Sequence, residues 1–138
     1  MAIMPMWPVT APQQLLISNG LATMGYAVPA AIGAALARPG DPVVALTGDG
    51  GLGMCLAELE TIARRNLPIV VVVFNDAELS LINIKRQPHH GDDRSVAYAP
   101  IDFGVVANGM GLHSVVAESA AEVDRVLGLH DFLSLIHI

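Results

Sequence analysis

The residues best suited to chemistry form a predicted glycine-rich loop, Gly48-Asp49-Gly50-Gly51-Leu52-Gly53, that follows a short apolar run. Glycines let backbone N–H groups approach an anion closely, and the N-terminus of a following helix adds partial positive charge. In an open parallel sheet, ligands bind at the carboxyl ends of the strands, where this stretch is expected to lie. We therefore predict a site for a phosphate-bearing ligand.

Asp49 indicates that a metal ion takes part. A bare carboxylate beside a pyrophosphate would be repelled in a partly buried site, whereas a divalent cation between them makes the arrangement favourable. Mg²⁺ commonly combines one or two carboxylates with phosphate oxygens. A second carboxylate, Asp76, follows the apolar run Ile69 to Phe74, and a backbone carbonyl near Glu78 offers a third oxygen. We expect these three residues to surround one Mg²⁺ ion.

Other interpretations of the same residues remain open. The stretch fits the Gly-x-Gly-x-x-Gly fingerprint of a Rossmann-type dinucleotide domain, with Asp76 where a ribose-binding carboxylate is expected. Such a domain would bind its ligand without Mg²⁺. Asp49 could also be an ordinary turn residue, because Asp-Gly is common in turns. A third possibility is a non-catalytic truncated chain that only pairs with other subunits and binds no cofactor.

Strands and helices alternate along the chain, which is typical of the α/β class. The strands are apolar throughout, as expected when both faces of a parallel sheet are covered. The prediction is a three-layer open parallel sheet with helices on both faces. Strands are predicted over 43–46, 69–74 and 114–117. Helices are predicted over 29–37, 54–65, 79–86, 100–108 and 119–127, with a polar loop over 87–99.

Three segments are expected. Residues 1–19 carry prolines and no periodic pattern, which indicates a connector or a truncated element. Residues 20–128 form the ligand-binding domain. Residues 129–138 end without a cap or a polar tail, and we expect them to be a non-native tail.

Charge, apolar run length and cysteine content limit the binding partners and the cellular location that we expect. The 138 residues have a net charge of −6 and no strong basic cluster, so no nucleic-acid partner is expected. The longest apolar run has far fewer than the roughly 20 residues that span a bilayer. The single cysteine, Cys55, allows no internal disulfide and favours a reducing, cytoplasmic location. Cys55 is expected to be an inert core thiol, and His89 and His90 to be exposed polar residues.

The motif Gly48-Asp49-Gly50, followed after residues 51–74 by Asn75-Asp76, resembles the Gly-Asp-Gly…Asn-Asn motif of thiamine-diphosphate-dependent enzymes. The stretch from Gly20 to Ala34 looks like the matching part of the acetolactate synthase and pyruvate oxidase group. The resemblance runs from about Leu15 to Val126. It implies the C-terminal cofactor-binding domain of such an enzyme, present here as a fragment, with the thiamine-diphosphate-binding fold.

The resemblance also implies roles for single residues. Asp49 matches the metal-binding aspartate, Asp76 the asparagine that ligates Mg²⁺, and Glu78 the residue whose main-chain carbonyl completes the protein ligands. Asp76 departs from the family's asparagine, but a carboxylate still ligates Mg²⁺. The residues implied to contact thiamine diphosphate are Ala22 through its carbonyl, Met24 beneath the two rings, and Gly48, Gly50 and Gly51 at the diphosphate. Met24 could otherwise be plain core filler.

The implied parent enzyme is a 2-oxo-acid decarboxylase or carboligase, a lyase or transferase similar to acetolactate synthase. The cofactor would serve as the electron sink. In this family a glutamate on a separate pyrimidine-binding domain starts the proton relay, and that domain is missing here. No catalytic residue is therefore expected in this chain, which should be inactive alone. A homodimer or homotetramer is implied, and the use of FAD is left open.

Overall fold

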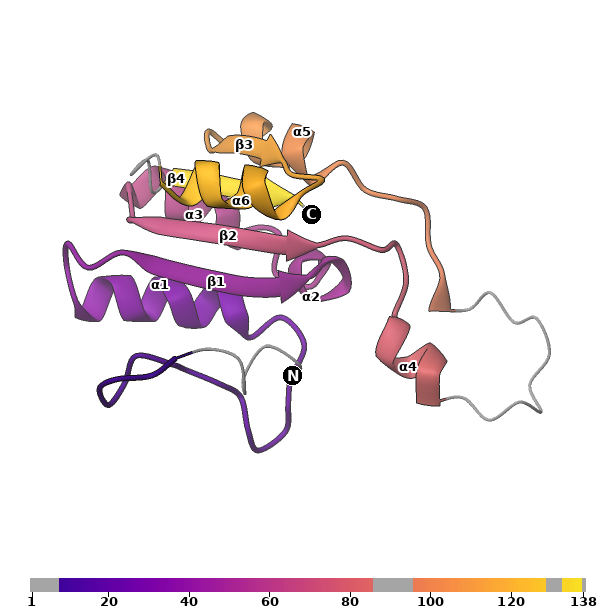
Figure 1. The fold of residues 1–138 in the computed structure, drawn as a ribbon, viewed down its shortest axis with the longest axis horizontal. Helices are drawn as coiled ribbons and strands as arrows, with labels where there is room; N and C mark the ends of the chain where they lie inside the picture. Colours follow the sequence, from indigo (N-terminus) through magenta and orange to yellow (C-terminus); the bar gives the residue numbers. More distant parts are fainter. Residues whose placement is uncertain (1–7, 86–95, 129–132, 138) are drawn as a thin grey trace.

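A computed structural model of the chain describes residues 8–85, 96–128 and 133–137. Its centre is a four-stranded parallel sheet in the order β1-β2-β4-β3 (Figure 1). The strands are β1 (Val43–Gly48), β2 (Ile69–Phe74), β3 (His113–Val116) and β4 (Leu133–His137). In the β1–β2 register Gly48 pairs with Phe74, so both strands end at the same edge of the sheet.

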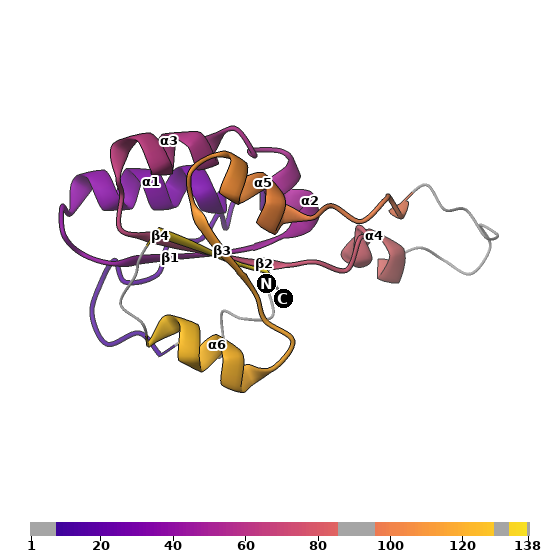
Figure 2. The same cartoon turned by 90° about the horizontal axis from the view of Figure 1, so that it is seen from above.

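Helices cover both faces of the sheet, which confirms the predicted three-layer fold class (Figure 2). The helices α1 (Ala27–Ala37), α3 (Glu58–Arg65) and α5 (Phe103–Gly109) lie on one face, and α6 (Ala120–Leu127) lies on the other. The larger core lies beneath the first three helices and includes Val28, Leu59, Ile62 and Phe103. A smaller core beneath α6 contains Val70, Val72, Ala117 and Val126.

Strand β2 explains why an unbroken apolar run belongs at the centre of the sheet. Ile69, Val71 and Val73 point into the larger core, while Val70 and Val72 point into the smaller one. Because alternate side chains of a strand face opposite sides, both sets must be apolar when both faces are covered. Only Phe74, at the carboxyl end, is substantially exposed.

The glycine-rich stretch differs from the predicted loop. Asp49–Gly53 form a five-residue helix, α2, which begins directly after the extended residue Gly48. The helix predicted from residue 54 starts later, at Glu58. Between them, the N–H groups of Cys55 and Glu58 donate to the carbonyls of Leu52 and Cys55, at 2.9 and 3.0 Å. These bonds span three residues rather than four, so they make a tight turn that separates the two helices.

Side chains and backbone conformation set the other helix ends. Helix α3 stops at Asn66, which takes the left-handed conformation with φ 49°. Helix α5 begins at Phe103 rather than at Pro100, because the Oδ1 atom of Asp102 accepts a hydrogen bond from the N–H of Val105 at 2.9 Å. Helix α6 has the predicted capping box, in which the hydroxyl of Ser119 accepts from the N–H of Glu122.

Strand β4 was not expected from the sequence. Residues 133–137 fill the position between β2 and β3, so the sheet extends beyond the predicted domain boundary at residue 128. Their mostly apolar sequence suits a strand with neighbours on both sides. The non-native origin of residues 129–138 stays a prediction.

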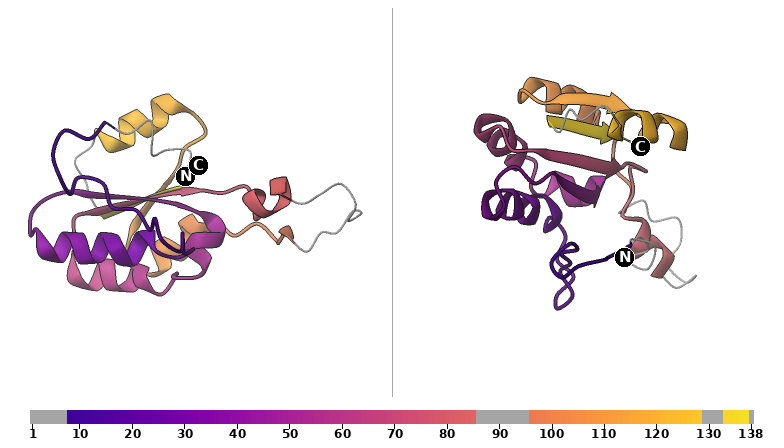
Figure 3. Two further views of the ribbon diagram at one scale, coloured as in Figure 1. Left: turned by 90° about the horizontal axis from the view of Figure 1, so that it is seen from below. Right: turned by 60° about the vertical axis from the view of Figure 1, so that its left-hand side comes forward.

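The N-terminal segment lies beside β1 and α1 and contains no helix or strand over residues 8–26 (Figure 3). One turn in this segment is closed by the side chain of Gln14, which accepts hydrogen bonds from the N–H groups of Thr10 and Ala11. The connector over 1–19 stays a prediction.

Helix α4 (Ser80–Lys85) stands apart from the sheet, on an arm that leaves the carboxyl end of β2 and returns to α5 (Figure 1). His89, His90 and most of the predicted loop over 87–99 lie outside the described residues. Within the described ranges, no helix has the length and apolar character that crossing a membrane requires.

The capping box of α6 gives a pH-dependent prediction. The Oε2 atom of Glu122 accepts hydrogen bonds from the N–H of Glu118 at 2.8 Å and from the hydroxyl of Ser119 at 3.1 Å, and these bonds lower its pKa. A lowered folded-state pKa stabilises the fold above the unfolded-state pKa, and the contribution is lost as the pH falls through the folded value. Urea titrations should therefore find Glu122→Gln less stable than the parent at neutral pH. The difference should close well below the ordinary pKa of 4.5. A difference that persists at acid pH would contradict this assignment.

Candidate functional site

An open groove of about 970 Å³ runs along β1, beside the N-terminal segment, and reaches the carboxyl ends of β1 and β2 and helix α4. Its volume is within the usual range of about 300 to 1,000 Å³ for small-molecule sites. Every residue predicted to contact cofactor or metal lines it: Ala22, Met24, Gly48, Asp49, Gly50, Gly51, Asp76 and Glu78. The structure thus brings together the residues that the sequence singled out.

Asp49 lies at the centre of this group and is only 4% exposed. Its Oδ1 atom accepts a hydrogen bond from the N–H of Gly50 at 2.7 Å, and its Oδ2 atom accepts one from the N–H of Ala77 at 2.8 Å. Ala77 lies 28 residues after Asp49 in the sequence and has a positive φ of 56°. The carboxylate therefore joins the loops that follow β1 and β2, which a local Asp-Gly turn would not do.

Asp76 lies in the second of these loops and is exposed. Its Oδ1 atom accepts from the N–H of Glu78 at 3.2 Å, and its Oδ2 atom accepts from the hydroxyl of Ser80, the first residue of α4. These bonds hold the turn into α4. A carboxylate has about four acceptor positions, so capacity remains for a cation.

The backbone carbonyl of Glu78 is available to a ligand. Glu78 pairs with Ala97 in an isolated antiparallel bridge, flanked by the bonds from Leu79 N–H to the Val96 carbonyl (2.9 Å) and from Tyr98 N–H to the Ala77 carbonyl (3.1 Å). A residue between two such bonds turns its own N–H and carbonyl away from the partner strand. The Glu78 side chain instead accepts a hydrogen bond from Asn83.

The chemistry of these donors fits Mg²⁺. Two carboxylates and a carbonyl supply only oxygen, the ligand type that Mg²⁺ prefers, and phosphate oxygens commonly complete such a site. Among the residues that the structure describes, no cluster of three or more His, Cys, Asp or Glu side chains could hold a metal alone. A cation at this edge therefore depends on the carbonyl and on oxygens that a ligand brings.

Close packing by neighbouring side chains requires glycine at two of the three predicted positions. A Cβ atom on Gly51 would lie 2.7 Å from the Oγ1 atom of Thr47, which is too close. A Cβ atom on Gly50 would lie 2.8 Å from the Cδ2 atom of Leu79 and 3.2 Å from the Cε atom of Met24. At Gly48 the nearest atom would be 3.9 Å away, so the third predicted glycine is not required by crowding.

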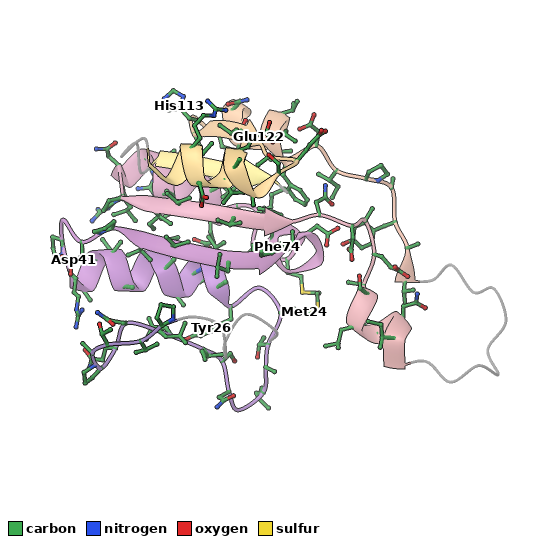
Figure 4. All side chains as sticks on the ribbon, viewed as in Figure 1. Met24, Tyr26, Asp41, Phe74, His113 and Glu122 are labelled. Carbon is green, nitrogen blue, oxygen red and sulfur yellow. The ribbon has the colours of Figure 1, made fainter. Side chains whose placement is uncertain are left out.

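Met24 and Ala22 come from the turn that precedes α1. Met24 is 40% exposed and lies between the strand ends and α4, so the core-filler interpretation is wrong (Figure 4). Gly25 has a positive φ of 78°, and a Cβ atom there would lie 3.3 Å from the Cβ atom of Met54. The Cε atom of Met24 lies 3.2 Å from the Cβ position of Gly50. Ala22 has a positive φ of 50° and an exposed side chain, and its carbonyl contact with a cofactor stays a prediction.

Tyr98 is the residue that sequence reasoning missed. Its hydroxyl oxygen is buried and lies 3.3 Å from the Cβ position of Gly50. Burial, then a hydrogen bond with the side chain of Asp49, and then the negative charges of Asp49 and Asp76 raise the pKa of Tyr98 to about 12. No motif contains Tyr98, because only the bridge between Glu78 and Ala97 brings it close to Gly50.

Adding one methyl group at Gly50 tests whether this residue contacts the ligand. Gly50→Ala places a Cβ against the flexible ends of Met24 and Leu79, so we expect the chain to fold but to lose about tenfold or more in affinity for a diphosphate ligand with Mg²⁺. Calorimetric titration measures the affinity, and thermal unfolding checks the fold. Gly53→Ala is the control on the same helix, because no atom lies within 4 Å of its Cβ position. Equal affinity in the two variants would show that Gly50 does not contact the ligand.

Sequence comparisons with known proteins identify the family of this domain. A family model described as the thiamine pyrophosphate enzyme, C-terminal TPP binding domain, matches residues 1–134. Acetolactate synthase of Bacillus subtilis (strain 168) is 37% identical over 116 residues, which cover 84% of this chain and 20% of that protein. The large subunit of acetolactate synthase isozyme 2 of Escherichia coli (strain K12) is 36% identical over 121 residues, which cover 86% of this chain and 22% of that protein.

A solved structure has the same fold. The thiamine diphosphate-dependent 4-hydroxybenzoylformate decarboxylase of Rhodococcus jostii RHA1 superimposes with a TM-score of 0.66 and 25% sequence identity. The alignment covers 83% of this chain and 23% of that chain. The present chain therefore spans about a fifth of the length of the curated relatives that it matches.

Proposed function

The chain belongs to the thiamine pyrophosphate enzymes, as their C-terminal TPP-binding domain, and on this basis we propose that it holds the diphosphate of the cofactor through a Mg²⁺ ion. Asp49, Asp76 and the carbonyl of Glu78 are the proposed protein ligands. The buried carboxylate of Asp49, between the ends of β1 and β2, is the observation that carries the proposal. A cation there would offset the negative charge of Asp49 and attract that of a diphosphate.

The other residues predicted to contact the cofactor are proposed to bind two different parts of it. Gly48, Gly50 and Gly51 would lie against the diphosphate, with Gly50 and Gly51 donating N–H groups. Met24 would support the rings of the cofactor, and the carbonyl of Ala22 would accept from its aminopyrimidine. The positions of all five on one groove support this division.

The family match makes the dinucleotide interpretation wrong, because the same glycine stretch belongs to a TPP-binding domain. We propose that the whole protein is a 2-oxo-acid decarboxylase or carboligase. The acetolactate synthases and the decarboxylase that resemble the chain support this class. Bound thiamine diphosphate supplies the electron sink for such reactions. The residues of this chain bind and orient it.

A further domain, with the glutamate that starts proton transfer, is proposed to complete the site. Exposed apolar side chains beside the groove support a partner surface, since burying them would stabilise an assembly: Leu21, Phe74, Leu81 and Ile82. We propose a homodimer or homotetramer in the cytoplasm.

Ligand-dependent stability tests the diphosphate site. In excess Mg²⁺, thiamine diphosphate and inorganic diphosphate should both raise the melting temperature of the chain, because each carries the group that the metal holds. Thiamine without phosphate should raise it much less. Stabilisation by thiamine but not by inorganic diphosphate would contradict a metal–diphosphate site.

A further inference from the structure

The groove extends beyond the proposed cofactor contacts, along the outer edge of β1. All six residues of β1, Val43–Gly48, line it. In the sheet order β1-β2-β4-β3, β1 pairs only with β2, so its other edge is open in the part of the chain that the structure describes. A strand of six residues is about 20 Å long. The groove therefore follows the edge of the sheet over the length of a whole strand.

Backbone polar groups of β1 face this part of the groove. The N–H of Val43 donates to the carbonyl of Pro68 at 2.9 Å, which fixes the side of the strand that Val43 turns toward β2. Successive residues of a strand turn their N–H and carbonyl groups to opposite edges, so those of Val44 and Leu46 face the groove. Among residues 8–85, 96–128 and 133–137, no backbone hydrogen bond joins β1 to the N-terminal segment. The open edge thus offers the donors and acceptors that a further strand needs.

Two other parts of the domain form walls beside that edge. Residues 13–18 of the N-terminal segment line the groove together with β1. Helix α1 contributes four alanines at helical spacing, Ala27, Ala30, Ala31 and Ala34. Their short side chains would let an extended backbone lie close to α1. A segment in this part of the groove would therefore lie between the N-terminal segment and β1, within the domain.

We propose that this part of the groove holds one further β-strand, an extended segment of the same protein that lies outside these 138 residues. The strand would hydrogen-bond to Val44 and Leu46 and turn apolar side chains toward the alanines of α1. The length of the relatives supports such a segment, since the chain covers only 20% of one acetolactate synthase and 22% of another. The inference goes beyond the cofactor site and does not depend on it.

The walls of the groove favour this occupant over a second copy of the chain. In each copy the β1 edge is flanked by that copy's own residues 13–18. Two copies could pair their β1 edges only by displacing both N-terminal segments. A strand of the same polypeptide can instead fold together with the two walls that it separates.

Backbone hydrogen exchange tests whether the edge is open. In the folded chain of 138 residues, the amides of Val44 and Leu46 should exchange about tenfold or more faster than those of Val43 and Ala45, because only the second pair donates to β2. In the complete protein all four amides should exchange slowly. Slow exchange of Val44 and Leu46 in the 138-residue chain would show that the edge is already closed.

A tethered strand tests whether the groove accepts one. The probe is a copy of Ile69–Phe74, the strand of this chain that is apolar on both faces, joined to the N-terminus by a flexible Gly-Ser linker of about 20 residues, which spans roughly 25 Å. We expect the fusion to slow exchange at Val44 and Leu46 by about tenfold or more and to raise the melting temperature. Exchange in His113–Val116, at the other edge of the sheet, should stay fast relative to these amides.

Proline substitutions supply the matched control. Val44→Pro removes an N–H that faces the groove, so the chain without the tether should still fold, whereas Ala45→Pro removes a bond to β2 and should lower the melting temperature. In the fusion, Val44→Pro should abolish the rise in melting temperature. Fast exchange of Val44 and Leu46 in the fusion or in the complete protein would overturn the proposal. Protection of these amides that accompanies dimerisation of the 138-residue chain in sedimentation would assign the edge to a second copy and would overturn it as well.

Discussion

Asp49→Asn is expected to abolish the stabilisation of the chain by thiamine diphosphate with Mg²⁺. The amide has almost the shape of the carboxylate but carries no charge, so it removes the strongest proposed ligand without opening a cavity. At a ligand concentration 100 times its dissociation constant, the parent chain should gain about 2.7 kcal/mol in free energy of unfolding. The variant should gain almost nothing at the same concentration, as measured by urea unfolding with and without ligand.

Asp41→Asn is the matched control for this prediction. Asp41 is an exposed aspartate that also lines the groove, but at the end away from Met24 (Figure 4). Its removal changes the net charge by the same amount and should leave the ligand-induced stabilisation intact. Full stabilisation of Asp49→Asn by ligand and metal would remove Asp49 from the metal site.

Phe103→Ala is expected to reduce the free energy of unfolding by about 3 to 5 kcal/mol. Phe103 is fully buried at the start of α5 and is among the largest buried side chains described. Its truncation removes contacts in the larger core and leaves a cavity. That loss is a large part of the 5 to 15 kcal/mol by which a domain is usually stable.

Val105→Ala tests the same helix on its outer face. Val105 is 67% exposed, so its truncation should change the stability by less than about 0.5 kcal/mol. Urea unfolding at one pH compares the two variants. Similar losses for Phe103→Ala and Val105→Ala would mean that α5 does not pack on the sheet as described.

The fold class and the composition of the groove could be predicted because each depends on local patterns. The all-apolar run of β2 requires cover on both faces, and the structure places its alternate side chains in two cores. Asp49 and Asp76 each follow a strand, and parallel strands of matched register end at one edge. The approach of Asp49 to the second loop, through the N–H of Ala77, follows from that register.

Other features depend on contacts that no local pattern encodes. Helix α2 was predicted as a loop because glycine has low helix propensity, yet the extended Gly48 and the buried Asp49 start a helical turn there. Helix α5 starts at the side chain of Asp102 instead of at Pro100. Tyr98 comes close to Gly50 through a bridge between two short segments, and its position depends on the fold of the arm.

Calorimetric titration of the folded chain with thiamine diphosphate, first in Mg²⁺ and then in a chelator, tests the metal–diphosphate site most directly. The proposed site predicts saturable binding in Mg²⁺ that disappears when the metal is removed. Binding of equal strength in the chelator, or no binding by the folded chain in Mg²⁺, would contradict it.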